Sequence, residues 1–569
     1  MRLAAAGSAK PRDGWLFGPG IDLILGCGLG SIAISVAMGF QATEIALWVP
    51  GALLVLLFSL PHYGATLLRV YELPEDRRRY SLFAVGATTL LALAFMGSLG
   101  DALVGSIVLT VYLTWSPWHY TGQNYGVFLI LLGRRGVGVA PGVKRWVYAS
   151  FILSYLLTFM AIHGLDRPDV YAPVNYAGTV YRLLPLGIPA SLSIPVFWGL
   201  AAAYVVALGV GLGSLWRSSS LSQVAPSLVV VATQSLWFVV PVVARYAVGP
   251  RALPGLAGIY DAYGFLWIAA AHAVQYLWVT AYFARRSGRA ASYGVYFAKT
   301  AFAGFAIWTL PALIFAPGVL GTWPHEAGLA VLVAAVVNIH HFILDGVIWK
   351  LRDGRIARVL LRKTSEPLFD SKIAAAPRRR WGAGVAGAIG AACIGVGLLA
   401  LWEEEAFRRA IVSGDVPRAR AAVERLGWIG REGPRTQVGL ARLYASRGQL
   451  AAADSHIRRS LALHPTPEAW RSLGLLSEQA AEWRAAESAY DGLLAMLPDD
   501  GPGLYRRGLA RLERGDAQGA LADLDRASEL HPEMKLIGLS RRRAERQLER
   551  QKDADPRVPS GARGQNSRE

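Results

Sequence analysis

Apolar runs long enough to cross a lipid bilayer recur along the first two thirds of this chain. A spanning helix needs roughly 20 predominantly apolar residues, and about eleven segments reach that length. They lie at 21–40, 45–68, 81–99, 102–132, 146–163, 192–215, 225–245, 262–284, 300–318, 328–349 and 381–401. The pattern predicts an all-α fold built on a polytopic helix bundle. A membrane domain would occupy residues 21–350, and a last span would follow at 381–401.

The composition agrees with a membrane protein. Of the 569 residues, 53% are hydrophobic and 17% are charged, which is too apolar for an ordinary soluble enzyme. The net charge of +18 lies largely in short loops between apolar runs. Because no nucleic-acid motif accompanies it, we expect the lipid bilayer and no nucleic acid as a partner. Cys27 and Cys393 both lie in apolar runs, so neither a disulfide framework nor a thiolate metal site is expected.

Basic residues fall in alternate loops and predict the topology. They are concentrated at Arg77–Arg79, Arg134–Arg145, Arg217, Arg285–Arg289 and Lys350–Arg380. Positively charged loops stay in the cytoplasm. We therefore expect a cytoplasmic N-terminal segment at 1–20, a basic cytoplasmic linker at 351–380, and everything after residue 402 on the outer side. In a bacterium the chain would lie in the inner membrane, with its C-terminal region in the periplasm.

The region 403–550 is polar and shows a repeat of about 34 residues. Pro465, Pro498 and Pro532 each close a unit, and Gly448, Ala481 and Gly515 mark the turn within each unit. Small residues recur in phase, as at Ala441, Gly474, Gly508, Ala453, Ala486 and Ala520. This resembles the tetratricopeptide repeat, which implies a helical solenoid that binds a protein or peptide partner. Residues 403–433 resemble a degenerate first unit, and the polar tail at 551–569 is expected to be disordered.

Five histidines lie inside the apolar runs. They are His62, His119, His272, His340 and His341. An ionisable side chain in hydrocarbon is costly and usually serves a site in the bundle interior, and imidazole is the commonest protein ligand for transition metals. The sequence therefore predicts an intramembrane metal centre. A lone membrane histidine often makes only an interhelical hydrogen bond, so each of the five also fits a structural role. The other five histidines fit surface or packing positions.

The sequence places the histidines at different depths within the membrane. Measured along each helix to the next basic residue, the four sites lie about 10 Å to 22 Å deep, a spread of roughly 12 Å. His62 is the shallowest on this scale because Arg69 follows it closely. The 102–132 run also contains Pro117, so we expect either a kinked helix or two half-segments there.

Amides and a carboxylate accompany the histidines at helical spacing. Gln123 follows His119 by four residues and Gln275 follows His272 by three. Asn338 and Asp345 lie on either side of His341, three and four residues away. Residues at these spacings share a helix face, so we expect these four side chains to orient the imidazoles or to add ligands. Aromatic residues crowd the same runs, and we expect them to wall a hydrophobic cavity: Tyr63, Trp115, Trp118, Tyr120, Tyr125, Tyr276, Trp278, Phe342 and Trp349.

Four short stretches resemble the Brp/Blh family of membrane β-carotene dioxygenases. They are Leu60–Gly64, Trp118–Tyr120, Ala271–His272 and His340–Asp345. The resemblance implies a nonhaem iron held by His62, His119, His272 and His340, with His341 as an extra or alternative ligand. The chain departs from the family where Gln123 stands for an expected aspartate and where no second histidine follows His272.

The leading hypothesis is a membrane iron oxygenase that acts on a lipid-soluble substrate. A haem protein, with two of the histidines as axial ligands, is the first alternative. The second is a non-enzymatic, membrane-anchored scaffold whose repeats bind a partner. Transport is less favoured because no inverted internal repeat is evident.

Overall fold

The computed structural model describes residues 14–34, 36, 51–164, 180–248, 262–351, 353–361 and 380–554. These residues form helices and no strand, which confirms the all-α prediction. The chain divides into two compact units. The first contains residues 1–315, 319–321 and 328–401, and the second contains residues 316–318, 322–327 and 402–569.

Seven helices of the described residues are long and apolar enough to cross a membrane. Each coincides with a predicted span: Leu82–Gly100 (η3 and α6), Pro141–His163 (α8), Ala190–Ser218 (α9), Leu221–Phe238 (α10), Tyr293–Ile314 (α14), Leu329–Ile348 (α15) and Gly384–Ser413 (in α17). The structure therefore has the helices expected of a membrane protein. Among the described residues, seven helices are long and apolar enough to span a bilayer, fewer than the eleven or so predicted from hydrophobic length.

Three other predicted spans are helical but are not among the seven. They correspond to Leu60–Tyr71 (α4, preceded by α3 at Gly51–Leu54 and η2 at Val55–Ser59), Ala102–Arg134 (α7) and Ala262–Arg286 (α13). These are the helices that carry His62, His119 and His272. The remaining span, 21–40, is described only in part. Pro19–Ile21 (α1) and Asp22–Gly26 (η1) are followed by a break at Gly28, where φ is +87°.

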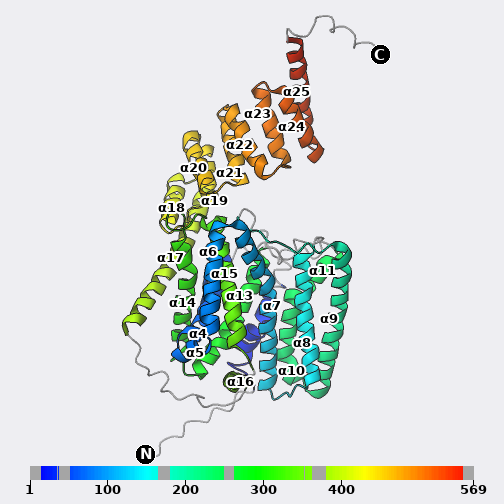
Figure 1. Cartoon of the computed structure of the whole chain (residues 1–569), viewed down its shortest axis with the longest axis vertical. Helices are drawn as coiled ribbons and strands as arrows, with labels where there is room; N and C mark the ends of the chain where they lie inside the picture. Colours follow the sequence, from blue (N-terminus) through cyan, green and yellow to red (C-terminus); the bar gives the residue numbers. More distant parts are fainter. Residues whose placement is uncertain are drawn as a thin grey trace, which may run out of the picture. The chain divides into compact units, whose positions relative to one another are not determined.

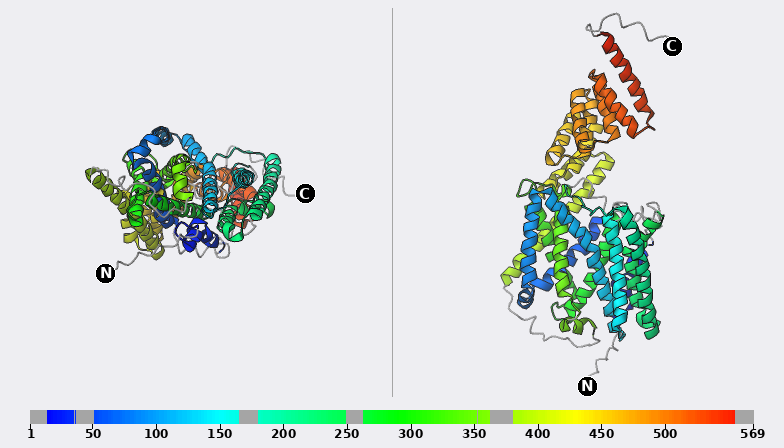
Figure 2. Two further views of the ribbon diagram at one scale, coloured as in Figure 1. Left: turned by 90° about the horizontal axis from the view of Figure 1, so that it is seen from below. Right: turned by 45° about the vertical axis from the view of Figure 1, so that its right-hand side comes forward.

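Helix α7 stands between two groups of helices in the first unit (Figure 1). It contacts α6 and α15 on one side and α8 and α10 on the other. The group beyond it consists of α8 to α11, with α11 at Val240–Val248, and the two groups stay side by side in the view turned by 45° (Figure 2). Pro117 does not divide α7 into half-segments, because the helix is continuous from Ala102 to Arg134.

Helices α4 and α14 cross in backbone contact. A Cβ atom on Gly64 would lie 1.9 Å from the carbonyl oxygen of Thr300, and one on Gly304 would lie 1.7 Å from that of Leu60. Small residues allow such close crossings in membrane bundles. This contact fixes the position of α4, which carries His62 two residues from Gly64.

Several basic segments meet at one end of the first unit. Pro74–Arg79 (α5) and the segment before Gly354–Leu361 (α16) are joined by an ion pair of 2.7 Å between Arg79 and Asp353. At the end of α7, Arg134 donates to the carbonyl oxygens of Trp15 and Leu360. These basic loops thus lie together, while the side of the membrane that they occupy stays a prediction. Residues 362–379 of the predicted linker lie outside the described residues.

The second unit is a row of helix hairpins (Figure 1). Three successive pairs are Pro434–Ser446 with Leu450–Leu463 (α19, α20), Pro467–Gln479 with Trp483–Met496 (α21, α22), and Gly501–Glu513 with Ala517–Leu530 (α23, α24). Val416–Trp428 (α18) precedes them and Lys535–Ala554 (α25) follows. The first residues of the predicted tail, 551–554, belong to α25, and the rest lie outside the described residues.

The turns within the hairpins fall where the repeat period predicts them. Gly448, Ala481 and Gly515 have φ angles of +73°, +55° and +86°. Gly414, at +73°, is the equivalent turn before α18, so the degenerate first unit is also a hairpin. Its first helix is the end of α17, Arg380–Ser413. The last predicted span and the first repeat therefore share one continuous helix.

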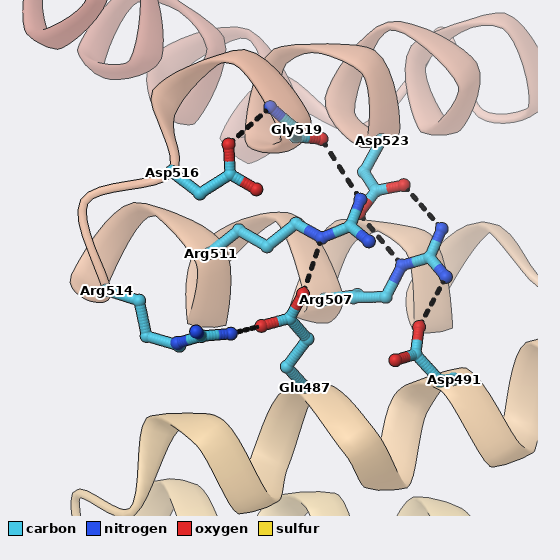
Figure 3. A network of polar contacts seen from close by, with 8 residues as sticks. All are labelled: Glu487, Asp491, Arg507, Arg511, Arg514, Asp516, Gly519 and Asp523. Atoms are coloured by element: carbon cyan, nitrogen blue, oxygen red, sulfur yellow. Dashed lines mark hydrogen bonds and ion pairs between the residues drawn. The ribbon is translucent and has the colours of Figure 1, made fainter.

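The repeating small residues are buried between the paired helices. Ala453, Ala486 and Ala520 have no exposed surface, and a Cβ on Gly474 would lie 2.5 Å from the ring of Tyr490. Arginines of α23 and the residue that follows it link this hairpin to the one before it (Figure 3). Arg507 and Arg511 both bond Asp523 of α24, while Arg511 and Arg514 bond Glu487 of α22.

Candidate metal centre

Four histidines from four helices converge in the interior of the first unit. His62 comes from α4, His119 from α7, His272 from α13 and His341 from α15. One ring nitrogen from each lies within 4.8 Å of the others. Imidazole nitrogens bind a transition metal at about 2.0–2.1 Å, so ligands on opposite sides of one ion stand about 4 Å apart. The four rings thus surround a volume of the size that a single ion requires.

One pair of nitrogens already has the spacing of two ligands. The Nε2 atoms of His119 and His341 are 3.2 Å apart. Two nitrogens bound at about 2.05 Å to one ion would be about 2.9 Å apart at a right angle and about 3.3 Å apart at a tetrahedral angle. The observed separation lies between these values. The rings of His62 and His341 also approach closely, with centroids 4.1 Å apart.

Burial leaves several of these nitrogens without partners. His62 and His272 are 2% and 1% exposed, and none of their ring nitrogens has a protein hydrogen-bond partner of normal geometry. A buried polar atom that makes no hydrogen bond costs free energy, and such atoms are rare. A neutral imidazole carries a lone pair on one ring nitrogen, and four such nitrogens close together can all bind one cation. The residues present therefore fit a metal ion.

A hydrogen-bond network holds His341 through its Nδ1 atom. Its Nδ1 lies 2.9 Å from the hydroxyl of Thr66. Thr66 and Tyr276 both donate to Oδ1 of Asp345, at 3.0 Å and 2.7 Å, and Trp349 donates to the Tyr276 hydroxyl. If Thr66 gives its single proton to the carboxylate, its oxygen accepts from His341 Nδ1–H. The Nε2 of His341 then keeps its lone pair for the site, which is the usual arrangement of a metal-binding histidine.

The amides predicted beside the site have a different role. Gln123 donates to Oε1 of Gln275 at 2.6 Å and to the backbone carbonyl of His272 at 3.1 Å. Gln275 donates to the carbonyl of Gly26, and Asn338 accepts from Tyr63. These amides tie helices together, and among the described residues no hydrogen bond joins their side chains to the imidazoles. Of the four predicted orienting residues, only Asp345 reaches the rings.

His340 lies apart from the cluster, although the family resemblance implies it as a ligand. Its Nε2 is 2.9 Å from the hydroxyl of Thr88 at the start of α6. Adjacent residues of an α-helix point about 100° apart, so His340 and His341 cannot face the same point. The structure brings His341 to the other three histidines.

Thr66 was not predicted at the site, and Tyr276 and Trp349 were expected only as walls of a cavity and not as hydrogen-bond partners. A signal was available for two of them. Thr66 follows His62 by four residues and Tyr276 follows His272 by four, which places each on the face of a predicted ligand. Two rings also stack on the imidazoles. Tyr120 lies on His272 with centroids 4.1 Å apart, and Phe342 lies on His119 at 4.4 Å.

A cavity of about 320 Å³ opens beside the cluster. His119 and Asp345 form its inner wall, and most of the rest is apolar. Of the aromatic residues expected to wall a cavity, those that line it are Trp115, Trp118, Tyr276, Phe342 and Trp349. Tyr63, Tyr120, Tyr125 and Trp278 are placed elsewhere. The Oε1 atom of Gln123, another lining residue, has no hydrogen-bond partner.

The remaining histidines serve local packing. His163 ends α8 and contacts Thr114 and the backbone of Leu186. In the second unit, His456 stacks on Tyr444 and His531 pairs with Glu533 on the surface. His464 contacts the ring of Trp323, and His325 contacts Arg431.

Comparisons with known proteins add no family to this description. No protein-family model matches the sequence, and no curated protein shows significant similarity to it. The function therefore has to be argued from the site.

Proposed function

We propose that this protein is a membrane metalloenzyme of the oxygenase type, with one nonhaem iron held by His62, His119, His272 and His341. The convergence of four ring nitrogens within 4.8 Å carries the proposal. Imidazole ligands suit iron, copper, nickel and zinc, and the resemblance of the surrounding stretches to membrane dioxygenases favours iron. Iron bound there would supply activation of dioxygen.

The packing of the rings favours a bare ion over haem. Two axial imidazoles of a haem must be separated by the whole macrocycle. Here the ring of His341 contacts those of His62 and His119, with centroids 4.1 Å and 4.8 Å apart. A porphyrin would require this cluster to open.

The substrate would be a lipid-soluble molecule. The cavity beside His119 is walled by Trp115, Trp118 and Phe342, and apolar cavities with few polar groups are typical of sites for hydrophobic ligands. Trp118 is also 38% exposed on the outside of the helix bundle. In a bilayer that surface meets acyl chains, which is a reasonable route for such a substrate.

Metal analysis of the purified full-length protein tests the proposal. We expect about one transition-metal ion per chain, and loss of most of it in His119→Ala and His272→Ala. His340→Ala is the matched control, because His340 is buried in α15 beside His341 but faces Thr88. Its metal content should equal that of the wild type. Wild-type protein with less than about half an equivalent of metal after expression in iron-rich medium would refute the metal centre.

A second candidate function is that of a membrane-anchored scaffold. It is favoured by the hairpin row of the second unit, whose repeat phase resembles the tetratricopeptide family and would present a surface for a protein or peptide. On this view the chain lies in a bacterial inner membrane with the repeats in the periplasm. Cross-linking from the repeats should then capture one partner, and histidine-to-alanine changes in the cluster should leave that capture intact.

A further inference from the structure

The carboxylate of Asp345 lies beside the four imidazoles with its two oxygens in different surroundings. Oδ1 accepts hydrogen bonds from Thr66 and Tyr276. Oδ2 lies 3.5 Å from Nε2 of His341 and 3.9 Å from Nε2 of His119. Asp345 is 7% exposed, and it shares the cavity wall with His119. One oxygen is therefore held by the protein, while the other faces the rings.

The side of the rings on which Oδ2 lies distinguishes two roles. A carboxylate that only orients a metal-binding histidine accepts from the nitrogen that does not bind the metal. In His341 that nitrogen is Nδ1, and Thr66 occupies it. Oδ2 instead lies near Nε2 of His341 and Nε2 of His119, the two nitrogens that face each other. It is on the metal side of both rings.

The distances are close to those of ligands that share one ion. Nitrogen and oxygen ligands bound at about 2.0–2.2 Å are about 2.9–3.5 Å apart when they are neighbours. The separation of 3.5 Å to His341 reaches this range, and the separation of 3.9 Å to His119 is slightly longer.

We infer that Asp345 is the fifth ligand of the metal, bound through Oδ2 on the side of the cavity. The inference rests on the proposed metal centre and adds to it. Four neutral imidazoles leave the full charge of a divalent ion in the bundle interior, where an uncompensated charge is costly. One carboxylate cancels half of that charge. Thr66 and Tyr276 act as positioning residues, because their hold on Oδ1 restricts the carboxylate to a single coordinating oxygen.

Cobalt binding to the full-length protein tests this ligand. Co²⁺ alone would be added to metal-free wild-type protein and to Asp345→Asn, which keeps the shape of the side chain. Removal of a ligand or its support weakens metal binding by roughly 10–100-fold, and we expect at least a tenfold loss, about the lower end of that range. The visible absorption should also change from the weaker bands of five-coordinate Co²⁺ to the stronger bands of a tetrahedral site. His340→Ala should show neither change.

The outcomes separate the two proposals. If Asp345→Asn binds Co²⁺ with the affinity and the spectrum of the wild type, Asp345 is not a ligand, while the four-histidine centre stands. If the wild type takes up no Co²⁺ and no iron, both proposals fail. If the variant does not fold, infrared difference spectra of the wild type labelled with ¹³C at its aspartate carboxylates replace it. Metal loading should then shift the carboxylate bands of an aspartate, and unshifted bands overturn the inference.

Discussion

The two units of this protein differ in where they place charged pairs. In the second unit charged pairs join neighbouring helices along the row of hairpins, as where Arg507 and Arg511 enclose Asp523. In the interior of the first unit the buried polar contacts are mostly between neutral groups, as where Gln234 bonds Asn124 and Ser154. Charged pairs are tolerated where water can reach their rim, whereas hydrocarbon favours neutral hydrogen bonds. Against that neutral background, four imidazoles without full sets of partners stand out as a site.

The largest effect should come from adding a methyl group where α4 and α14 cross. Gly304→Ala places a methyl group against the carbonyl of Leu60, and overpacking of this kind costs about 2–3 kcal/mol. Because α4 carries His62, metal content should fall together with resistance to unfolding in denaturing detergent. Gly199→Ala and Gly209→Ala on α9, where a Cβ meets nothing within 4 Å, should lower neither quantity, because alanine favours a helix over glycine. Equal losses in all three variants would contradict the close-contact argument.

A smaller effect is expected from the charged network of the second unit. Asp523→Ala leaves Arg507 and Arg511 without their shared partner (Figure 3). Breaking a largely buried ion pair of this kind should cost about 2 kcal/mol, less than for a fully buried pair because both arginines keep some exposure. Faster amide hydrogen exchange in α23 and α24 would report it. The exposed pair of Arg458 and Asp454 supplies the control, since Asp454→Ala should cost about 0.5 kcal/mol or less.

Ala481→Gly should stabilise the second unit. Ala481 has a φ of +55° and occupies the turn position that Gly448 and Gly515 fill in the neighbouring hairpins. A left-handed conformation costs an alanine about 1 kcal/mol and costs glycine little. The thermal transition of the second unit should therefore rise in the variant. Gly448→Ala should lower it by a similar amount, and a transition unchanged in both variants would argue against strain at these turns.

The smallest effect concerns acid. Burial acts to raise the pKa of Glu487, but hydrogen bonds and charge from Arg511 and Arg514 outweigh it and lower the pKa below its ordinary value of 4.5. The unfolded chain then binds more protons in acid, so this contribution is complete above the ordinary value and is lost as the pH falls below it. Glu487→Gln should reduce the acid sensitivity of the unfolding of the second unit by about a few tenths of a kcal/mol. An identical pH profile in both proteins would show that the pair contributes nothing.

The repeat region could be read from the sequence in detail because its signals are local. The turn at Ala481 and the buried small residues at Ala486 and Ala520 follow from a period within the chain. Each hairpin packs on its neighbours in sequence, so no long-range contact had to be guessed. The continuation of the last span into the first repeat was missed, because the change from apolar to charged composition near residue 402 was taken as the end of a helix. The helical pattern in fact runs on through that point, as far as Ser413.

The candidate site could be predicted only in part. The residue type and the apolar setting identify His62, His119 and His272 as candidates, but the choice between His340 and His341 depends on the rotation of α15 about its own axis. The predicted spread of about 12 Å in depth is not found, because one ring nitrogen from each of the four histidines lies within 4.8 Å of the others. Arg69, from which the depth of His62 was measured, is only 7% exposed, and it pairs with Asp76 at 3.0 Å. The support from Thr66 and Tyr276 depends on contacts between helices that are distant in the chain.

The order in which the helices are made limits when this centre can form. His62 lies near the beginning of the chain, and His341 lies on α15, after most of the bundle. The proposed ion could be held by all four rings only after α15 has been made, so it would be captured after the helices have assembled rather than during their synthesis. Once captured, it would join four separately inserted helices, and its removal should expose them to membrane proteases.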